Sequence, residues 1–167
     1  RPQVWASYVE GLAGDLAELE QKRRLRKAVA AAETGGTGIA CFDAWVEELV
    51  TTGYVHNHAR MWFASIWIFT LNLPWRLGAD FFYRHLLDGD PASNTLGWRW
   101  VAGLHTRGKP YEAKAWNIAT FTANRFQPDE GDFTSGVQGL QDEEPEGLPP
   151  IMALRPVSIP KTGVPSV

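Results

Sequence analysis

The sequence predicts an all-α domain followed by a proline-rich segment. Apolar residues recur at three- to four-residue intervals through residues 1–126, and no alternating strand pattern occurs there. Helix-ending signals such as Gly53 and Pro74 follow the apolar stretches. At 167 residues the chain is long enough for one domain with a substantial core. We therefore expect a helical domain over residues 1–126 and a tail or linker over residues 127–167.

Five stretches account for the expected helices. Residues 3–33 form one helix, or two, because Gly11 and Gly14 weaken the middle. The other stretches cover residues 42–51, 56–72, 78–87 and 92–102. The stretch 56–72 is apolar on most of its circumference, which predicts burial on several sides. Its tryptophans, Trp62 and Trp67, are therefore assigned to the core.

The charge is unevenly distributed along the chain. The whole sequence has a formal net charge of −3, but residues 127–167 carry seven acidic and two basic residues, which leaves 14 basic and 12 acidic residues in the helical domain. The acidic balance belongs to the tail, so it does not exclude binding to DNA. The tail also holds seven of the eleven prolines, which favours a linker or disordered segment over a recognition peptide.

Cysteine usage and hydropathy favour the cytoplasm. Cys41 is the single cysteine, so no internal disulfide can form, and a reducing compartment fits best. The longest apolar run, residues 61–73, is shorter than the ~20 residues of a membrane-spanning helix. We expect a cytoplasmic protein without a membrane span, and a monomer.

Several polar side chains are candidates for chemistry. His56 and His58 are the nearest pair of histidines, but residues two apart on a helix point to different faces, so we expect no metal site. Asp88 and Asp90 could act as an acid/base pair, although carboxylates flanking a glycine in a turn more often cap helices or hold an arginine. The basic cluster in residues 22–27 could contact phosphates, although a solvated helix face is the favoured interpretation.

The stretch from Gly53 to Trp100 concentrates tryptophan and polar groups. It contains five of the eight tryptophans, together with Arg60, two aspartates and an asparagine. Apolar walls hold a ring, while polar groups fix its edges. This composition therefore suits a planar, redox-active, partly charged ligand.

Three motifs in this stretch resemble those of a known family. They are TGYVHNHARM at residues 52–61, LPWRLGADFFYRHLLDGD at 73–90 and PASNTLGWRW at 91–100. The resemblance covers residues 37–126 and is to the FAD-binding helical domain of the photolyase/cryptochrome family. It implies FAD as cofactor. For the repair branch it implies light-driven electron transfer from reduced flavin to a pyrimidine dimer flipped out of damaged DNA.

The resemblance also implies roles for individual residues. Asn94 would lie next to flavin N5, where plant-type cryptochromes carry aspartate, so it favours the repair branch. In the branch of the family that repairs six-four photoproducts, two histidines stand at the positions of Asn57 and Met61. This chain has neither histidine, so the resemblance implies cyclobutane dimers as the substrate. The full assignment is cofactor binding by Asn57, Arg60, Asp88, Gly89, Asp90 and Asn94, electron transfer by Trp98 and Trp75, and contact with damaged DNA by His58, Met61, Trp100 and Asn117.

The sequence departs from the family pattern in three respects. The surface tryptophan of the electron relay falls at Lys22, so the third step is lost, rerouted, or carried by Tyr8 or Trp5. His58 stands in place of an arginine, which removes a phosphate contact or makes it pH-dependent. The family's N-terminal α/β domain and the first half of its flavin domain have no counterpart here. We expect this fragment alone to bind FAD weakly or not at all.

Three functions remain open from the sequence. The first is light-driven repair of cyclobutane dimers, as in a deoxyribodipyrimidine photo-lyase, and the identities of Asn94, Met61 and Trp100 favour it. The second is a cryptochrome-like photoreceptor without repair activity, which the broken relay and the proline-rich tail favour. The third is a structural helical module that has lost flavin.

Overall fold

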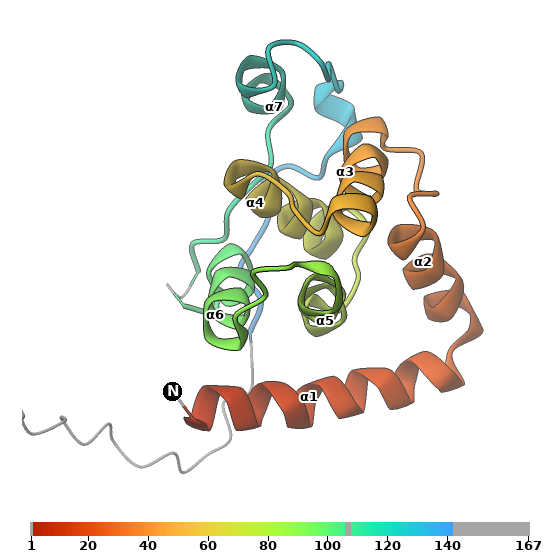
Figure 1. Cartoon of the computed structure of the whole chain (residues 1–167), viewed down its shortest axis with the longest axis vertical. Helices are drawn as coiled ribbons and strands as arrows, with labels where there is room; N and C mark the ends of the chain where they lie inside the picture. Colours follow the sequence, from red (N-terminus) through yellow and green to blue (C-terminus); the bar gives the residue numbers. More distant parts are fainter. Residues whose placement is uncertain (1, 106–107, 142–167) are drawn as a thin grey trace, which may run out of the picture.

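The computed structural model describes residues 2–105 and 108–141, and within them the chain forms helices and no strand (Figure 1). The all-α class is therefore confirmed. In chain order the elements are α1 (Pro2–Gln21), α2 (Arg23–Glu33), α3 (Ala40–Thr52), α4 (Asn57–Ser65), the π-helix η1 (Ile66–Thr70), α5 (Trp75–His85), α6 (Pro91–Val101), α7 (Ala115–Phe121) and the 3₁₀-helix η2 (Glu130–Asp132).

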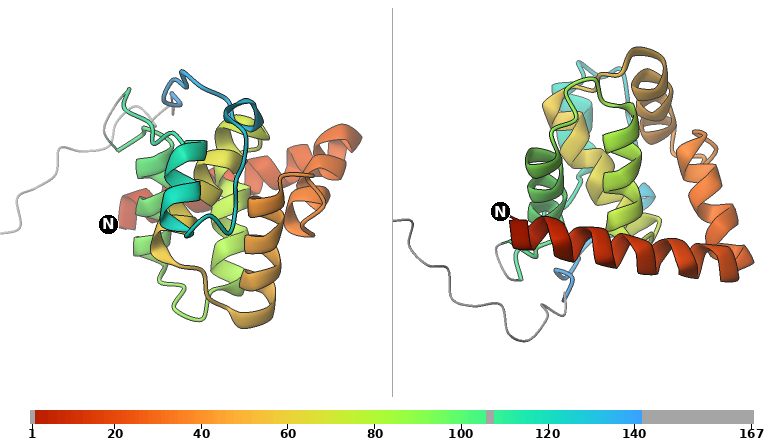
Figure 2. Two further views of the ribbon diagram at one scale, coloured as in Figure 1. Left: turned by 90° about the horizontal axis from the view of Figure 1, so that it is seen from above. Right: turned by 60° about the horizontal axis from the view of Figure 1, so that its bottom comes forward.

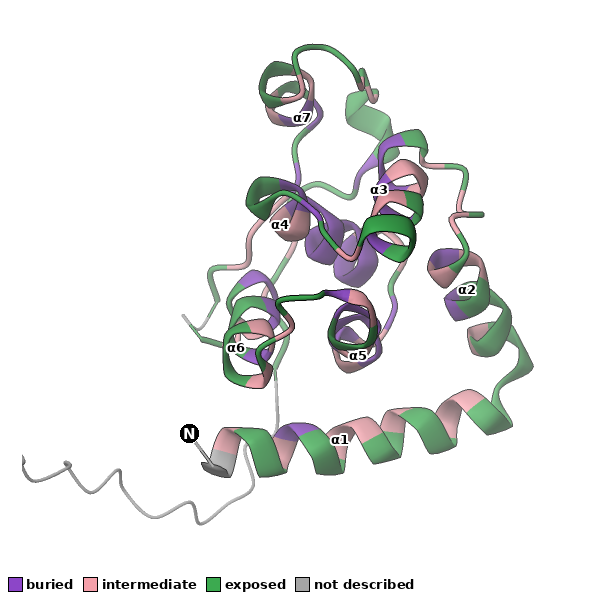
Figure 3. Ribbon diagram, viewed as in Figure 1, coloured by how far each residue is buried: buried purple, intermediate pink, exposed green. Residues whose placement is uncertain are grey.

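The helices are arranged around α4 and the π-helix that continues it. α3 and α6 pack against α4, and α5 packs against η1 and α6 (Figures 1 and 2). α1 crosses the base of the molecule, where it contacts α5 and α6, and α2 leads from its far end to α3. Buried residues face this centre, whereas much of α1 and α2 is exposed (Figure 3). The arrangement brings together α4, α5 and α6, which carry most of the three sequence motifs.

The first expected helix consists of two, and the break is at Lys22 rather than at the glycines. Lys22 has extended backbone angles (φ −100°, ψ 96°), whereas Gly11 and Gly14 stay helical. At Gly11 the backbone of α1 lies directly against the Arg76 side chain. A Cβ at this position would overlap the guanidinium of Arg76. The break lets α2 turn and bury Val29, while the basic side chains of residues 22–27 are exposed, as the solvated-face interpretation requires.

The helix expected over residues 56–72 changes its hydrogen-bond pattern half way. α4 is followed without interruption by the wider π-helix, in which the amide of Leu71 donates to the carbonyl of Ile66, five residues back, at 2.9 Å. Pro74 follows the end of this unit, as predicted. The carbonyl of Pro74 accepts a hydrogen bond from Nε1 of Trp67 at 3.0 Å, which ties the buried indole to the start of α5.

Aromatic rings form the centre of the core, and Phe63 lies in the middle of them. Its fully buried ring stacks on Phe42 with centroids 4.2 Å apart and lies 4.8 Å from Phe82. Three further rings lie 6.1–6.4 Å from it, those of Trp67, Phe81 and Trp98. Such pairs add specific ring–ring attraction to the burial of apolar surface. Trp62 and Trp67 are buried, so their assignment to the core is confirmed, and Trp45 is buried as well.

A short helix, α7, lies beyond the last helix expected from the sequence, and the sequence pattern did not predict it. Tertiary hydrogen bonds hold it in place. The buried hydroxyl of Ser65 accepts a bond from the amide of Ala113 at 2.9 Å, and Nε1 of Trp62 donates to the Asn117 side chain at 2.9 Å. Ser65 is therefore a structural anchor for the chain entering α7.

Packed contacts continue past the boundary expected at residue 127. Phe133 is buried, and the amide of Leu140 donates to the carbonyl of Ala102 at 2.9 Å. A Cβ at Gly103 would lie 2.9 Å from Cα of Gly139, so the two backbones approach too closely for a side chain there. The first part of the predicted tail is thus packed on the helical domain. The rest, residues 142–167, lies outside the described residues.

The single cysteine is unreactive because it is buried. Cys41 is 2% exposed, and burial raises the pKa of its thiol to about 11. The thiol is therefore protonated at neutral pH and is a poor nucleophile.

Among the described helices, none has the length and hydropathy needed to cross a membrane.

Candidate functional site

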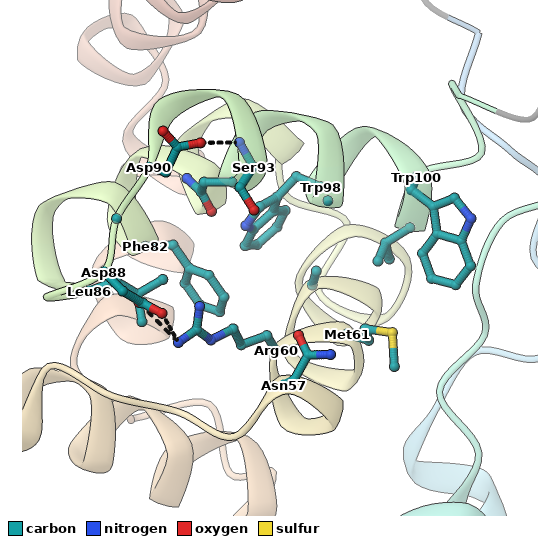
Figure 4. A pocket seen from close by; sticks show the side chains of 15 residues that line it. Asn57, Arg60, Met61, Phe82, Leu86, Asp88, Asp90, Ser93, Trp98 and Trp100 are labelled. Atoms are coloured by element: carbon teal, nitrogen blue, oxygen red, sulfur yellow. Dashed lines mark hydrogen bonds and ion pairs between the residues drawn. The ribbon is translucent and has the colours of Figure 1, made fainter. Parts of the chain in front are cut away.

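A pocket opens between α4, α5 and α6, where the three motifs meet (Figure 4). It encloses about 230 Å³. This volume is smaller than the ~300–1,000 Å³ of pockets that enclose a drug-sized ligand. The pocket can therefore hold only a portion of such a ligand. Most site residues expected from the sequence line it, namely Asn57, Arg60, Met61, Asp88, Gly89, Asp90, Asn94, Trp98 and Trp100.

An arginine and an aspartate hold each other at one end of the pocket. One terminal nitrogen of Arg60 lies 3.1 Å from both carboxylate oxygens of Asp88, and its Nε donates to the carbonyl of Val55 at 2.8 Å (Figure 4). The Asp88 side chain is 63% exposed, so this ion pair adds little stability. Its effect is to fix the direction of the guanidinium along the pocket wall. The prediction that a carboxylate of this turn holds an arginine is correct for Asp88.

The second aspartate of the turn caps a helix. Oδ1 of Asp90 accepts a hydrogen bond from the amide of Ser93 at 2.7 Å, and Pro91 occupies the first turn of α6. This is the capping arrangement that the turn composition favoured. Asp90 therefore sets where α6 begins, and with it the positions of Asn94 and Trp98 one and two turns further on.

The Asn94 side chain has a defined orientation. Its Nδ2 donates to the carbonyl of Ala79 on α5 at 2.7 Å. Because a carbonyl only accepts, the atom nearest to it must be the amide nitrogen, which leaves Oδ1 as the other end of the group. Asn94 also lines the pocket, so it presents this wall with a neutral acceptor oxygen.

Trp98 forms the inner wall and carries an unused donor. The residue is 2% exposed, and among the described residues its Nε1 has no hydrogen-bond acceptor. A buried donor without a partner costs about 1–3 kcal/mol, so a bound group that accepts this hydrogen bond would recover that cost. The ring stands edge-on to Phe82 and Trp67, with centroids 5.2 and 6.3 Å away.

Glycine at position 78 makes room for this indole. A Cβ there would overlap the six-membered ring of Trp98 and lie 2.9 Å from Cε2 of Trp67. We expect Gly78→Ala to lower the free energy of unfolding by about 1–3 kcal/mol, because overpacking outweighs the gain in helix propensity. Urea unfolding measures it. The matched control is Gly14→Ala, where nothing lies within 4 Å of the added methyl group. Equal or greater stability of Gly78→Ala would contradict the packing described here.

The other end of the pocket is apolar and carries Met61 and Trp100 (Figure 4). The Trp100 side chain is 40% exposed, and its ring is tilted 33° against that of Tyr111 with centroids 5.5 Å apart. Tyr111 therefore supports one side of the indole. An exposed, supported aromatic plane at a pocket mouth is suited to stacking on a flat partner.

Three of the expected site residues lie outside the pocket lining. Trp75 is buried at the start of α5, where its ring lies 5.8 Å from that of Tyr8. His58 is exposed, and its ring stacks on Trp62 with centroids 5.9 Å apart. Asn117 accepts the hydrogen bond from Trp62. Electron transfer by Trp75 and DNA contact by His58 and Asn117 stay predictions.

Comparison with known proteins matches this fold and pocket to one family. The model of the FAD-binding domain of DNA photolyase matches residues 6–135, which is well over half of the chain. The chain belongs to this family. FAD is therefore the cofactor of the photolyase-type domain to which these helices belong.

Individual photolyases align with the same region. The chain is 36% identical over 108 residues to a deoxyribodipyrimidine photo-lyase of Neurospora crassa, which covers 65% of the chain and 17% of the relative. It is 45% identical over 78 residues to the deoxyribodipyrimidine photo-lyase of Streptomyces griseus and 41% identical over 79 residues to that of Escherichia coli. Each of these two matches covers 47% of the chain and 17% of the relative. The matched region is thus less than a fifth of these curated relatives.

The pocket residues fit a flavin. A flavin ring has an apolar face and a polar edge with both hydrogen-bond donors and acceptors, and Asn94 and Trp98 offer an acceptor and an unused donor to such an edge. Phe82 and Leu86 supply buried apolar surface in the same lining. The size of the pocket fits the ring system or another part of FAD rather than the whole dinucleotide.

Several lining residues were not expected from the sequence. They are Ala64, Phe82, Leu86, Ser93, Gly97 and Val101. Their helical spacing from expected residues was the available signal, since Ala64 follows Met61 by one turn and Gly97 follows Asn94 likewise. Phe82 and Leu86 are buried and also line the pocket.

Proposed function

We propose that this chain forms part of the catalytic domain of an FAD-dependent enzyme that repairs cyclobutane pyrimidine dimers in DNA under blue light, of the deoxyribodipyrimidine photo-lyase type. The observation that supports this most is the layout of the pocket. Its polar end carries Arg60 and Asp88, its inner wall carries Asn94 and Trp98, and its mouth carries Met61 and Trp100. Groups suited to a redox cofactor therefore lie beside groups suited to a flat lesion.

FAD would supply the light-driven electron to the dimer and take it back after the ring splits. The residues of this chain hold and tune that chemistry. Oδ1 of Asn94 would accept a hydrogen bond from a flavin N–H, and as a neutral group it would not repel a negatively charged reduced ring. Nε1 of Trp98 would donate to a flavin acceptor atom. The fixed guanidinium of Arg60 favours negative charge on the ligand at the polar end.

Cyclobutane dimers are the proposed lesion. Repair of six-four photoproducts uses a histidine pair in the family, and this chain has Asn57 and Met61 at those places, both lining the pocket. Neither side chain titrates near neutral pH, so neither is suited to general acid catalysis. Splitting a cyclobutane dimer by electron transfer requires no such acid. Met61 and Trp100 at the mouth instead offer apolar contact and stacking to a flipped-out dimer. These contacts offset the cost of taking the dimer out of the DNA stack, which is about a few kcal/mol.

Loss of the Trp100 ring should weaken dimer binding. We expect Trp100→Ala to reduce the affinity for an oligonucleotide with one dimer by about 1–3 kcal/mol, because a stacked ring is removed. Binding titrations of the full-length protein in the dark measure it. The matched control is Trp116→Ala, since Trp116 is 58% exposed and lies outside the pocket lining. Equal affinities of the Trp100→Ala and wild-type proteins would contradict the assignment.

The proposed function is tested on the full-length protein that contains this chain. The purified protein is examined for flavin absorbance and is then given oligonucleotides with either a cyclobutane dimer or a six-four photoproduct under blue light. The expected result is bound flavin with loss of cyclobutane dimers only. Bound flavin without repair of either lesion would support the photoreceptor instead, and absence of flavin would contradict both functions.

A further inference from the structure

We propose that electrons which replenish Trp98 during light-driven reduction of the flavin enter the protein at Trp5, with the ring of Tyr8 as the bridge to Trp75. This inference rests on the proposed function and assigns the relay step for which the sequence left three alternatives. The two aromatic residues come from α1, whereas Trp75 and Trp98 come from α5 and α6.

The inner part of this path lies between α5 and α6. The Trp98 ring packs on Gly78, and Gly78 lies one helical turn from Trp75 on the same face of α5. The guanidinium of Arg99, which follows Trp98 on α6, lies 6.0 Å from the Trp75 ring centroid. Trp75 and Trp98 therefore lie on the two helices of one helix–helix contact, α5 and α6.

The outer part crosses to α1 through ring contacts. The Trp75 and Tyr8 centroids are 5.8 Å apart, and those of Tyr8 and Trp5 are 5.3 Å apart. Trp75 and Tyr8 are buried, whereas Trp5 is 39% exposed. A continuous series of rings thus runs from the buried indole of Trp75 to the surface. Lys22, where the family pattern would place the surface tryptophan, is an exposed lysine paired with Glu18.

Contact with solvent favours Trp5 as the terminal residue. Trp5 is 39% exposed in this chain, whereas Trp75 is buried. Water at an exposed indole stabilises its oxidised form and accepts its proton.

Tyr8 acts as a bridge rather than as a resting place for the positive charge. Burial raises the pKa of its phenol, so the group resists losing its proton. Oxidation of a phenol that keeps its proton is harder than oxidation of an indole. The charge therefore passes the Tyr8 ring and settles on Trp5.

Each electron that leaves a residue of this path is replaced. Trp98 gives one electron to photoexcited oxidised flavin, Trp75 refills Trp98, and Trp5 refills Trp75 across Tyr8. The Trp5 radical cation releases its indole proton to water and becomes a neutral radical. A thiol in solution then supplies one electron, and water supplies one proton, which restores Trp5.

The test uses the full-length flavin-loaded protein with its flavin oxidised. A blue laser flash generates the radical, and electron paramagnetic resonance with ring-deuterated tryptophan or tyrosine identifies the residue that carries it. Reduction of the flavin under steady light with thiol is measured in parallel. The variants are Trp5→Phe, Tyr8→Phe, Tyr8→Leu and the control Trp116→Phe, an exposed tryptophan outside the path.

The proposal predicts a persistent tryptophan radical that Trp5→Phe and Tyr8→Leu remove, together with loss of flavin photoreduction in both. Tyr8→Phe, which keeps the bridging ring, and Trp116→Phe should behave as the wild-type protein. Wild-type photoreduction in Trp5→Phe, or a radical on Tyr83, whose ring lies 6.4 Å from that of Trp5, would overturn the assignment. Failure of the proposed function can be distinguished from failure of this relay. If the proposed function is wrong, the wild-type protein will contain no flavin, or it will not repair dimers even after its flavin has been reduced chemically.

Discussion

Replacement of Trp98 by phenylalanine is expected to abolish light-driven reduction of the flavin and to spare repair by protein that has been reduced chemically. Phenylalanine is not oxidised under these conditions, so the first electron donor is lost. Its ring still fills most of the space against Phe82 and Trp67, and the pocket wall is therefore kept. The two activities separate because repair draws its electron from flavin that is already reduced, whereas photoreduction draws it from the protein.

The measurement compares two assays on the same full-length preparation. Accumulation of reduced flavin under blue light is followed first, and loss of dimers is then followed after reduction with dithionite. Trp45→Phe is the matched control, because Trp45 is equally buried but lies outside the pocket lining. Photoreduction in Trp98→Phe at the rate of the control would show that Trp98 is not the donor. Loss of both activities would point to a structural role alone.

Truncation of Phe63 should have the largest effect on stability. Its fully buried ring touches rings from α3, α5, α6 and η1, and Phe→Ala changes in such cores cost about 3–5 kcal/mol. That is a large share of the ~5–15 kcal/mol by which a domain is stable. Phe82 and Trp98 line the pocket and rest on this ring, so flavin content should fall together with the unfolding midpoint.

Urea unfolding and flavin content of Phe63→Ala test this coupling. Phe121→Ala is the control, because Phe121 is 62% exposed on α7 and its loss should change the free energy of unfolding by no more than ~0.5 kcal/mol. Equal effects of the two substitutions would contradict the central position of Phe63 in the core. A destabilised Phe63→Ala protein with normal flavin content would contradict the link from core to pocket.

The sequence predicted those features that depend on local patterns. Turn composition at Asp88-Gly89-Asp90 favoured an arginine partner and a helix cap, and one aspartate does each. Pro74 and Gly53 mark helix ends as expected. Most pocket residues were also expected, because the motifs that carry them keep a specific order and spacing.

Features that depend on contacts distant in sequence were not predictable in this way. The break at Lys22 involves no helix-breaking residue, and it accompanies the packing of α2, which buries Val29. α7 depends on bonds made by Ser65 and Trp62, which lie on another helix and carry no local signal for it. The described part of the predicted tail is held by contacts such as the one between Gly103 and Gly139.

The central claim is that this pocket brings a reduced flavin into electron-transfer contact with a pyrimidine dimer. The fluorescence lifetime of reduced flavin in the full-length protein tests it most directly, with a single-dimer oligonucleotide, with the undamaged strand, and without DNA. We expect the lifetime to shorten with the dimer alone, because electron transfer to the lesion competes with emission. The same lifetime with damaged and undamaged DNA, at concentrations where both are bound, would contradict it.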